Sequence, residues 1–162
     1  MSTKHRAGRP DLPRGSDLAD AERGLAGQQA RSQHAQQGYE LLAARFAEAT
    51  DLQDLGVRYV RFATGHPAHF QVMFRPELLR TDAPELRAAR RRTRTQLREA
   101  VGALGGDEEA SGAGVMAAWA VAHGFASLLL THNLDETLAG RDPEAVFRSL
   151  AQVMFQRSGP GA

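Results

Sequence analysis

The side chains with the clearest chemical potential are His123 and Ser127, which lie one helical turn apart in the uncharged stretch AAWAVAHGFASLLL, residues 117–130. A histidine beside a serine is the starting arrangement for nucleophilic catalysis. No acidic residue lies nearby to orient the imidazole, and a regular helix lacks the strained turn that exposes a nucleophile. The sequence therefore predicts that the protein is not an enzyme. A small helical enzyme that uses His123 is the less favoured alternative.

The six histidines raise the question of a metal site. His66 and His69 are three residues apart, but His123 and His132 lie far along the chain and no HExxH spacing occurs. The chain contains no cysteine, which excludes disulfides and Cys-based metal sites. We therefore expect no metal and no cofactor, and histidines that cap helices or line a pocket.

The run RAARRRTRTQLR, residues 87–98, has the composition of a phosphate-binding segment. No aromatic residue is interleaved, no helix-turn-helix signature accompanies the run, and the net charge of the chain is only +1. We interpret the run as a solvated face of a helix. Nucleic-acid binding through this face and the basic N-terminus is the rival hypothesis. The arginines that share one sector of the helix are Arg87, Arg90, Arg91, Arg94 and Arg98.

Apolar residues recur with helical periodicity from residue 34 onward, and no segment alternates between apolar and polar residues as a strand would. Thr50 and Gln53 resemble a capping box at the start of the second helix. Gly65 would end that helix. Prolines begin or cap three later helices: Pro67, Pro84 and Pro143. The pattern predicts an all-α bundle of about six helices, covering about 34–49, 51–65, 67–75, 84–104, 113–133 and 142–157.

Residues 1–33 differ in composition from the rest, because Gly, Pro, Arg, Ser and Gln dominate and apolar residues are few. Such a segment cannot bury enough apolar surface to offset its ordering entropy. We therefore expect a disordered or irregular tail over 1–33, with at most a short helix near 17–30 and no recognisable helix-turn-helix. After this segment, the chain would continue with a helical domain over 34–157 and a flexible tail over 158–162.

The sequence gives no sign of export or membrane insertion. The N-terminus does not resemble a signal peptide, and we expect no run that approaches the roughly 18 uncharged apolar residues of a membrane span. The lack of cysteine fits a reducing compartment. We predict a soluble, cytoplasmic protein without a membrane partner.

A helix over residues 117–130 would be apolar on every face, and such a helix must be covered on all sides. One face can pack into its own bundle, and the other needs a second cover because contiguous apolar patches are unusual on monomers. The amphipathic last helix follows closely, so two copies would form a four-helix interface about a twofold axis. We therefore predict a homodimer with an interface of Ala117, Val121, Gly124, Phe125, Leu128, Phe147, Leu150 and Met154.

Aromatic residues gather in the second and third helices and recur in the uncharged helix. Core packing explains most of them, but a small-molecule pocket between helices uses the same residue types with a few polar groups for orientation. Tyr59, His123 and Ser127 are the candidates for those polar groups. The candidate pocket residues are Tyr59, Phe62, Phe70, Met73, Phe74, Trp119, His123 and Ser127.

Three blocks of the sequence resemble the C-terminal effector-binding and dimerisation domain of TetR-type transcriptional regulators. They are GYELLAARFAEA (38–49), LGVRYVRFATGHPAHFQVMF (55–74) and the uncharged stretch, which carries the Trp-x-x-x-His-Gly (WHG) signature of one subgroup in Trp119, His123 and Gly124. The resemblance covers about residues 34–157. It implies an all-α domain that dimerises through its last two helices and encloses an effector pocket. The residues that would border this pocket are the candidate pocket residues named above, except Ser127.

The resemblance also implies a function. In such regulators a small apolar effector shifts the separation of the two DNA-binding domains of a dimer, because it binds two arrangements of the helical bundle with different affinity. Residues 1–33 lack the three-helix DNA-binding domain of these proteins, so we expect DNA as a partner only if a helix-turn-helix is present in the native chain. The alternative is a headless partner protein that forms heterodimers with a full-length regulator or titrates it.

Overall fold

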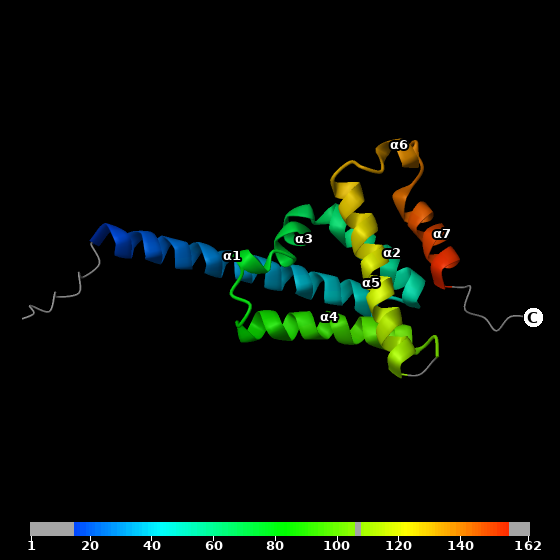
Figure 1. Ribbon diagram of the computed structural model, residues 1–162, viewed down its shortest axis with the longest axis horizontal. Coiled ribbons are helices and arrows are strands. Elements are labelled where there is room, and N and C mark those ends of the chain that lie inside the picture. The colour runs from blue at the N-terminus through cyan, green and yellow to red at the C-terminus, as the bar shows by residue number, and fades with distance from the viewer. Residues whose placement is uncertain (1–14, 106–107, 156–162) are drawn as a thin grey trace, which may run out of the picture.

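The computed structural model describes residues 15–105 and 108–155, which form an all-helical bundle (Figure 1). Within these ranges no strand occurs, and the all-α fold predicted from the sequence is confirmed. The predicted count of about six helices becomes seven α-helices there, because a short helix, α6, follows α5. The elements are α1 (Gly15–Ala47), α2 (Leu52–Gly65), α3 (Pro67–Met73), the 3-10 turn η1 (Pro76–Leu78), α4 (Pro84–Gly102), α5 (Glu108–Leu130), α6 (Asp135–Leu138) and α7 (Pro143–Phe155).

Helix α1 begins well inside the segment that the sequence predicted to be an irregular tail. The expectation of an irregular tail was wrong for residues 15–33, and the short helix expected near 17–30 is there part of the longer helix α1. Gly is frequent in this stretch, but so are Ala and Gln, which favour helices, as do the Leu, Arg and Glu residues between them. The predictions for residues 1–14 and 158–162 fall outside the described residues.

Contacts with the segment before α4 hold the middle of α1 in place. The Ser32 hydroxyl accepts a hydrogen bond from the Arg80 backbone N–H at 2.7 Å, and Gln28 Nε2 donates to the Leu79 carbonyl at 3.4 Å. From there α1 and α4 run side by side (Figure 1). The first turns of α1 extend beyond this contact, and the side chains of residues 20–26 are exposed.

The caps of the helices follow local chemistry. Asp51 caps α2, since its Oδ1 accepts a hydrogen bond from the Asp54 backbone N–H at 2.7 Å, and Asp54 Oδ2 accepts from the Thr50 N–H at 3.1 Å. The capping box therefore lies one residue later than the predicted pair of Thr50 and Gln53. An aspartate is the better acceptor for the free N–H groups of a first turn, because it adds a favourable charge. Gly65 closes α2 as predicted.

Helix α2 is the centre of the bundle and packs against α1, α5 and α7. Its Val57 and Val60 are each only 1% exposed. Helix α7 lies close to α2 at Gly56, where a Cβ atom would come within 2.6 Å of Cε1 of Phe147. A glycine at this position therefore sets how closely these two helices approach.

Helix α5 contains a longer uncharged run than the sequence analysis recognised. Over Ser111–Leu130 it is long and apolar enough, by length and composition alone, to cross a membrane, which corrects the expectation that no run approached that length. In the bundle this helix packs against α2 and α4 and buries Ala118, Ala122 and Ala126. The protein core thus accounts for one of its faces.

Candidate functional site

Tyr59 of α2 and His123 of α5 form a polar pair inside the bundle. The Tyr59 hydroxyl lies 2.8 Å from Nδ1 of His123, at hydrogen-bond distance. The stripe of α2 that includes Leu55 and Phe62 turns toward the core, and Tyr59 shares this face with an exposure of 4%. His123 is half-buried. The pair links two helices that are far apart in the sequence.

Three aromatic rings surround His123. The ring centroid of Phe74 lies 4.5 Å from that of His123 in an edge-on arrangement, and Phe70 stacks on it at 5.2 Å. Trp119, one turn earlier on α5, lies 5.5 Å away and is 46% exposed. We call Tyr59, Phe70, Phe74, Trp119 and His123 the aromatic enclosure. Trp119 forms one wall of the aromatic enclosure and lies at the surface of the protein.

Burial disfavours the charged forms of both polar groups of the aromatic enclosure. Desolvation raises the pKa of Tyr59 and lowers the pKa of His123, because each charged form is disfavoured away from water. When the Tyr59 hydroxyl donates to Nδ1, the imidazole proton is on Nε2. In that tautomer His123 has one hydrogen-bond donor left for a bound molecule.

The other three predicted pocket residues lie elsewhere or at the edge. Phe62 is buried, and its ring lies 5.4 Å from that of His66. Met73 is fully buried against Gly38 of α1. Ser127 is half-buried, one turn beyond His123 on α5. The structure therefore brings together five of the eight predicted residues, His123 and four residues around it.

Tyr39 and Arg90 extend this site, although the sequence analysis did not select them for it. The Tyr39 ring lies 6.1 Å from that of Phe74, and its hydroxyl donates to the Met73 carbonyl at 3.1 Å. The guanidinium of Arg90 lies over the Tyr39 ring at 5.5 Å. Tyr39 lies in the buried apolar stripe of α1 with Leu42 and Phe46, so helical periodicity contained a signal for it. Phe74 contacts both His123 and Tyr39 and connects the enclosure to α1.

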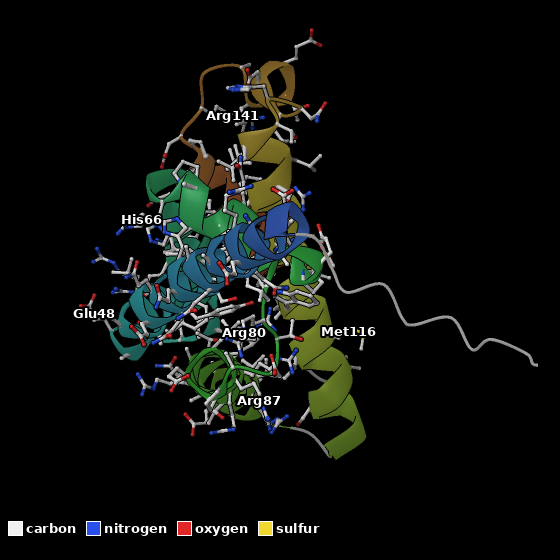
Figure 2. All side chains as sticks on the ribbon, turned by 90° about the vertical axis from the view of Figure 1, so that its left-hand side faces the viewer. Glu48, His66, Arg80, Arg87, Met116 and Arg141 are labelled. Carbon is white, nitrogen blue, oxygen red and sulfur yellow. The ribbon has the colours of Figure 1, made fainter. Side chains whose placement is uncertain are left out.

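The predicted dimer residues divide into surface and core positions. Ala117, Leu128 and Met154 are exposed, and the half-buried positions are Val121, Gly124 and Leu150. Phe125 and Phe147 are buried in the protomer, with ring centroids 5.3 Å apart. Both rings belong to the core of the protomer, where α7 packs against α2, so the other six predicted positions are the ones left accessible to a partner. Exposed Met116 and Val153 enlarge the apolar surface instead, and Figure 2 shows Met116 on the outside of α5.

A separate groove lies where α1 ends, α2 begins and α4 ends, with a volume of about 450 Å³. Apolar side chains, including Phe46 and Leu55, form its walls, and Asp51 lines it. Gln96 also lines the groove. Its Nε2 donates to the Ala43 carbonyl at 3.0 Å, whereas its buried Oε1 has no partner in the part of the chain that the structure describes. The sequence carried no signal for this groove, because three helix ends form it.

A cluster of histidines joins α1 to the junction of α2 and α3. The rings of His34 and His69 stack at 3.8 Å, and His66 lies edge-on to His69 at 5.9 Å. Burial lowers the pKa of His69, and positive charge on the other two rings would lower it further. Among residues 15–105 and 108–155, no group of three potential ligands has the arrangement of a metal site.

The chain matches a known protein family. The family model described as "Tetracyclin repressor-like, C-terminal domain" matches residues 52–154. This range contains α2 to α7 almost completely and every residue of the aromatic enclosure. No curated protein matches the chain.

Proposed function

Because the chain belongs to the family of tetracyclin repressor-like C-terminal domains, we propose that it is the effector-binding and dimerisation domain of a cytoplasmic transcriptional regulator of the Trp-x-x-x-His-Gly (WHG) subgroup. One observation carries the effector site within this proposal. The Tyr59–His123 pair is enclosed by aromatic rings at a point where Trp119 borders the surface. The protein acts by binding, not by catalysis.

The aromatic enclosure suits a small, flat and mainly apolar effector with one hydrogen-bond acceptor. The rings of Phe70, Phe74 and Trp119 offer apolar faces, and Nε2–H of His123 offers a single donor. The rings contact one another, so the effector enters by displacing Trp119 and Phe74, which are less buried than Tyr59 and Phe70. Movement of Phe74 is then passed to Tyr39 and α1.

The same proposal includes a homodimer. The exposed apolar side chains of α5 and α7 form its interface, with Ala117, Leu128 and Met154 at the surface and Val121, Gly124 and Leu150 beside them. Small residues along this face of α5 let two helices approach closely. Burying these side chains removes apolar area from water and stabilises the association.

Sequence-specific DNA binding requires a helix-turn-helix in the native chain. A headless domain that pairs with a full-length regulator is the second candidate function, and the exposed α5 and α7 surface suits such a heterodimer equally well. Mixing the protein with a full-length relative distinguishes the two, because a headless partner would release the relative from its operator.

Trp119 is the only tryptophan in the chain, so its fluorescence reports on the aromatic enclosure alone. We expect a set of small planar compounds to include one that changes this fluorescence in a saturable manner. His123→Ala should weaken that compound at least tenfold. The matched control is His132→Ala, at an exposed histidine just beyond α5, which should bind as the original chain does. Equal binding by both variants would place the effector elsewhere.

A further inference from the structure

Helix α4 concentrates positive charge on one line of its surface. It carries six arginines and two glutamates, in a chain whose net charge is only +1. Arg87, Arg91, Arg94 and Arg98 follow one another at intervals of four, three and four residues, so they form a single row along the helix. We call these four residues the arginine row. At 1.5 Å per residue the row is about 16 Å long.

The arginine row differs from Arg90 of the same helix, which packs against core residues. Arg90 is half-buried, lies over the Tyr39 ring and donates from Nη2 to the Met73 carbonyl at 3.4 Å. The four members of the row are exposed, and in the described part of the chain none forms an ion pair with a carboxylate. Figure 2 shows Arg87 at the outer surface of α4.

Folding alone does not account for this row. Like charges at spacings of three and four residues repel one another and destabilise a helix. Exposed arginines without partners add no compensating contact. An anionic partner would remove the repulsion, because each guanidinium can form two parallel hydrogen bonds with a phosphate.

The surroundings of the row identify the kind of anion. No exposed large apolar side chain lies within α4, and the exposed residues next to the row include Ala88, Thr95 and Gly102. An amphipathic helix that lies in a membrane surface inserts apolar side chains, and the centre of a protein interface is apolar. Binding to a regular row of phosphates requires only positive charges placed along a straight helix.

We propose that the arginine row binds the phosphate backbone of duplex DNA without reading its sequence. This inference goes beyond the proposed function, because it concerns α4 and does not depend on an effector in the aromatic enclosure. Four phosphate contacts would give a dependence of log affinity on log salt with a slope of about −3.6. The affinity would then fall by about a hundredfold between about 50 and about 200 mM salt.

The test is fluorescence anisotropy of a labelled duplex titrated with the 162-residue chain. The quadruple variant R87Q/R91Q/R94Q/R98Q should bind at least tenfold more weakly at low salt, with a flatter salt dependence. The matched control R45Q/R80Q/R92Q/R148Q removes the same charge from exposed arginines outside the row, and it should retain most of the affinity. Two duplexes of unrelated sequence should bind equally well.

Three outcomes would overturn the inference. Equal loss in the two quadruple variants would show that only total charge matters. Unchanged binding by R87Q/R91Q/R94Q/R98Q would place the contact elsewhere, for example in the basic N-terminal residues. Tighter binding to vesicles of phosphatidylserine and phosphatidylcholine than to duplex would assign the row to a membrane surface. Circular dichroism of each variant verifies that the helices are intact.

Discussion

Gly56 of α2 lies directly beneath the ring of Phe147 of α7, so close that a Cβ atom at Gly56 would come within 2.6 Å of the ring carbon Cε1. The ring is 2% exposed and is also held by Phe125 of α5. Three helices therefore meet at one aromatic side chain. The position of α7, which carries part of the apolar surface, depends on this contact.

Gly56→Ala should destabilise the protein by about 1 to 3 kcal/mol, because the added methyl group overpacks the contact with Phe147. The measurement is urea unfolding followed by circular dichroism. Gly65→Ala is the matched control in the same helix, where a Cβ atom would meet nothing within 4 Å. It should leave stability unchanged or raise it slightly. Equal stabilities for the two variants would contradict the close approach of α7 to α2.

Tyr59→Phe should cost about 1 to 2 kcal/mol of unfolding free energy. The substitution keeps the ring but removes the hydroxyl that lies 2.8 Å from Nδ1 of His123, which leaves a partly buried nitrogen without its partner. Chemical denaturation measures the loss. An NMR spectrum of the imidazole should also show that His123 changes its tautomer balance. An unchanged imidazole spectrum would argue against the hydrogen bond.

The stability of the fold should decrease as the pH falls below about 6.5. Burial lowers the pKa of both His69 and His123 below the ordinary histidine value of 6.5. The unfolded chain therefore binds protons at these sites before the folded chain does, so the free energy of unfolding rises with pH in this window and falls on acidification. Urea midpoints between about pH 7.5 and about pH 5 test this, above the range where carboxyl groups titrate. A flat profile would contradict it, and His69→Gln together with His123→Gln should reduce the slope.

Leu128→Glu should convert the predicted homodimer into a monomer. Leu128 is 44% exposed on the uncharged face of α5, and a carboxylate there would have to be buried without a partner in the interface. Sedimentation equilibrium should give twice the mass of one chain for the original protein and the mass of one chain for the variant. Leu25→Glu changes a leucine that is 62% exposed on α1, away from this face, and should leave the dimer intact. A dimer that survives Leu128→Glu would show that a different surface is used.

The sequence predicted the helices and the centre of the site because local rules control them. Proline fixes the backbone at Pro67, Pro84 and Pro143, and these residues begin α3, α4 and α7. Helical periodicity placed Tyr59 on the inner face of α2, and the four-residue spacing placed Trp119 beside His123.

Features that depend on contacts between distant segments were not predictable in the same way. Periodicity identifies the apolar face of α7, but not whether α2 or a second copy covers Phe147. Composition suggested an irregular segment at Ser32, whose hydroxyl is held by the Arg80 backbone 48 residues later. The groove beside Gln96 arises from the arrangement of three helix ends, which no local pattern encodes.

The continuous course of α1 makes it a lever arm. Its packed half ends near Ala47 and is held at Tyr39, which contacts Phe74 and, through it, the ring of His123. Its other half is tied to the segment before α4 at Gln28 and Ser32 and then projects to Gly15, about 36 Å from Tyr39 along the helix axis. A tilt of about 5° at Tyr39 would displace the far end by about 3 Å, given this length and a rigid helix. A small displacement of one phenylalanine ring would thereby be amplified into a movement of several ångströms at the N-terminal end of α1.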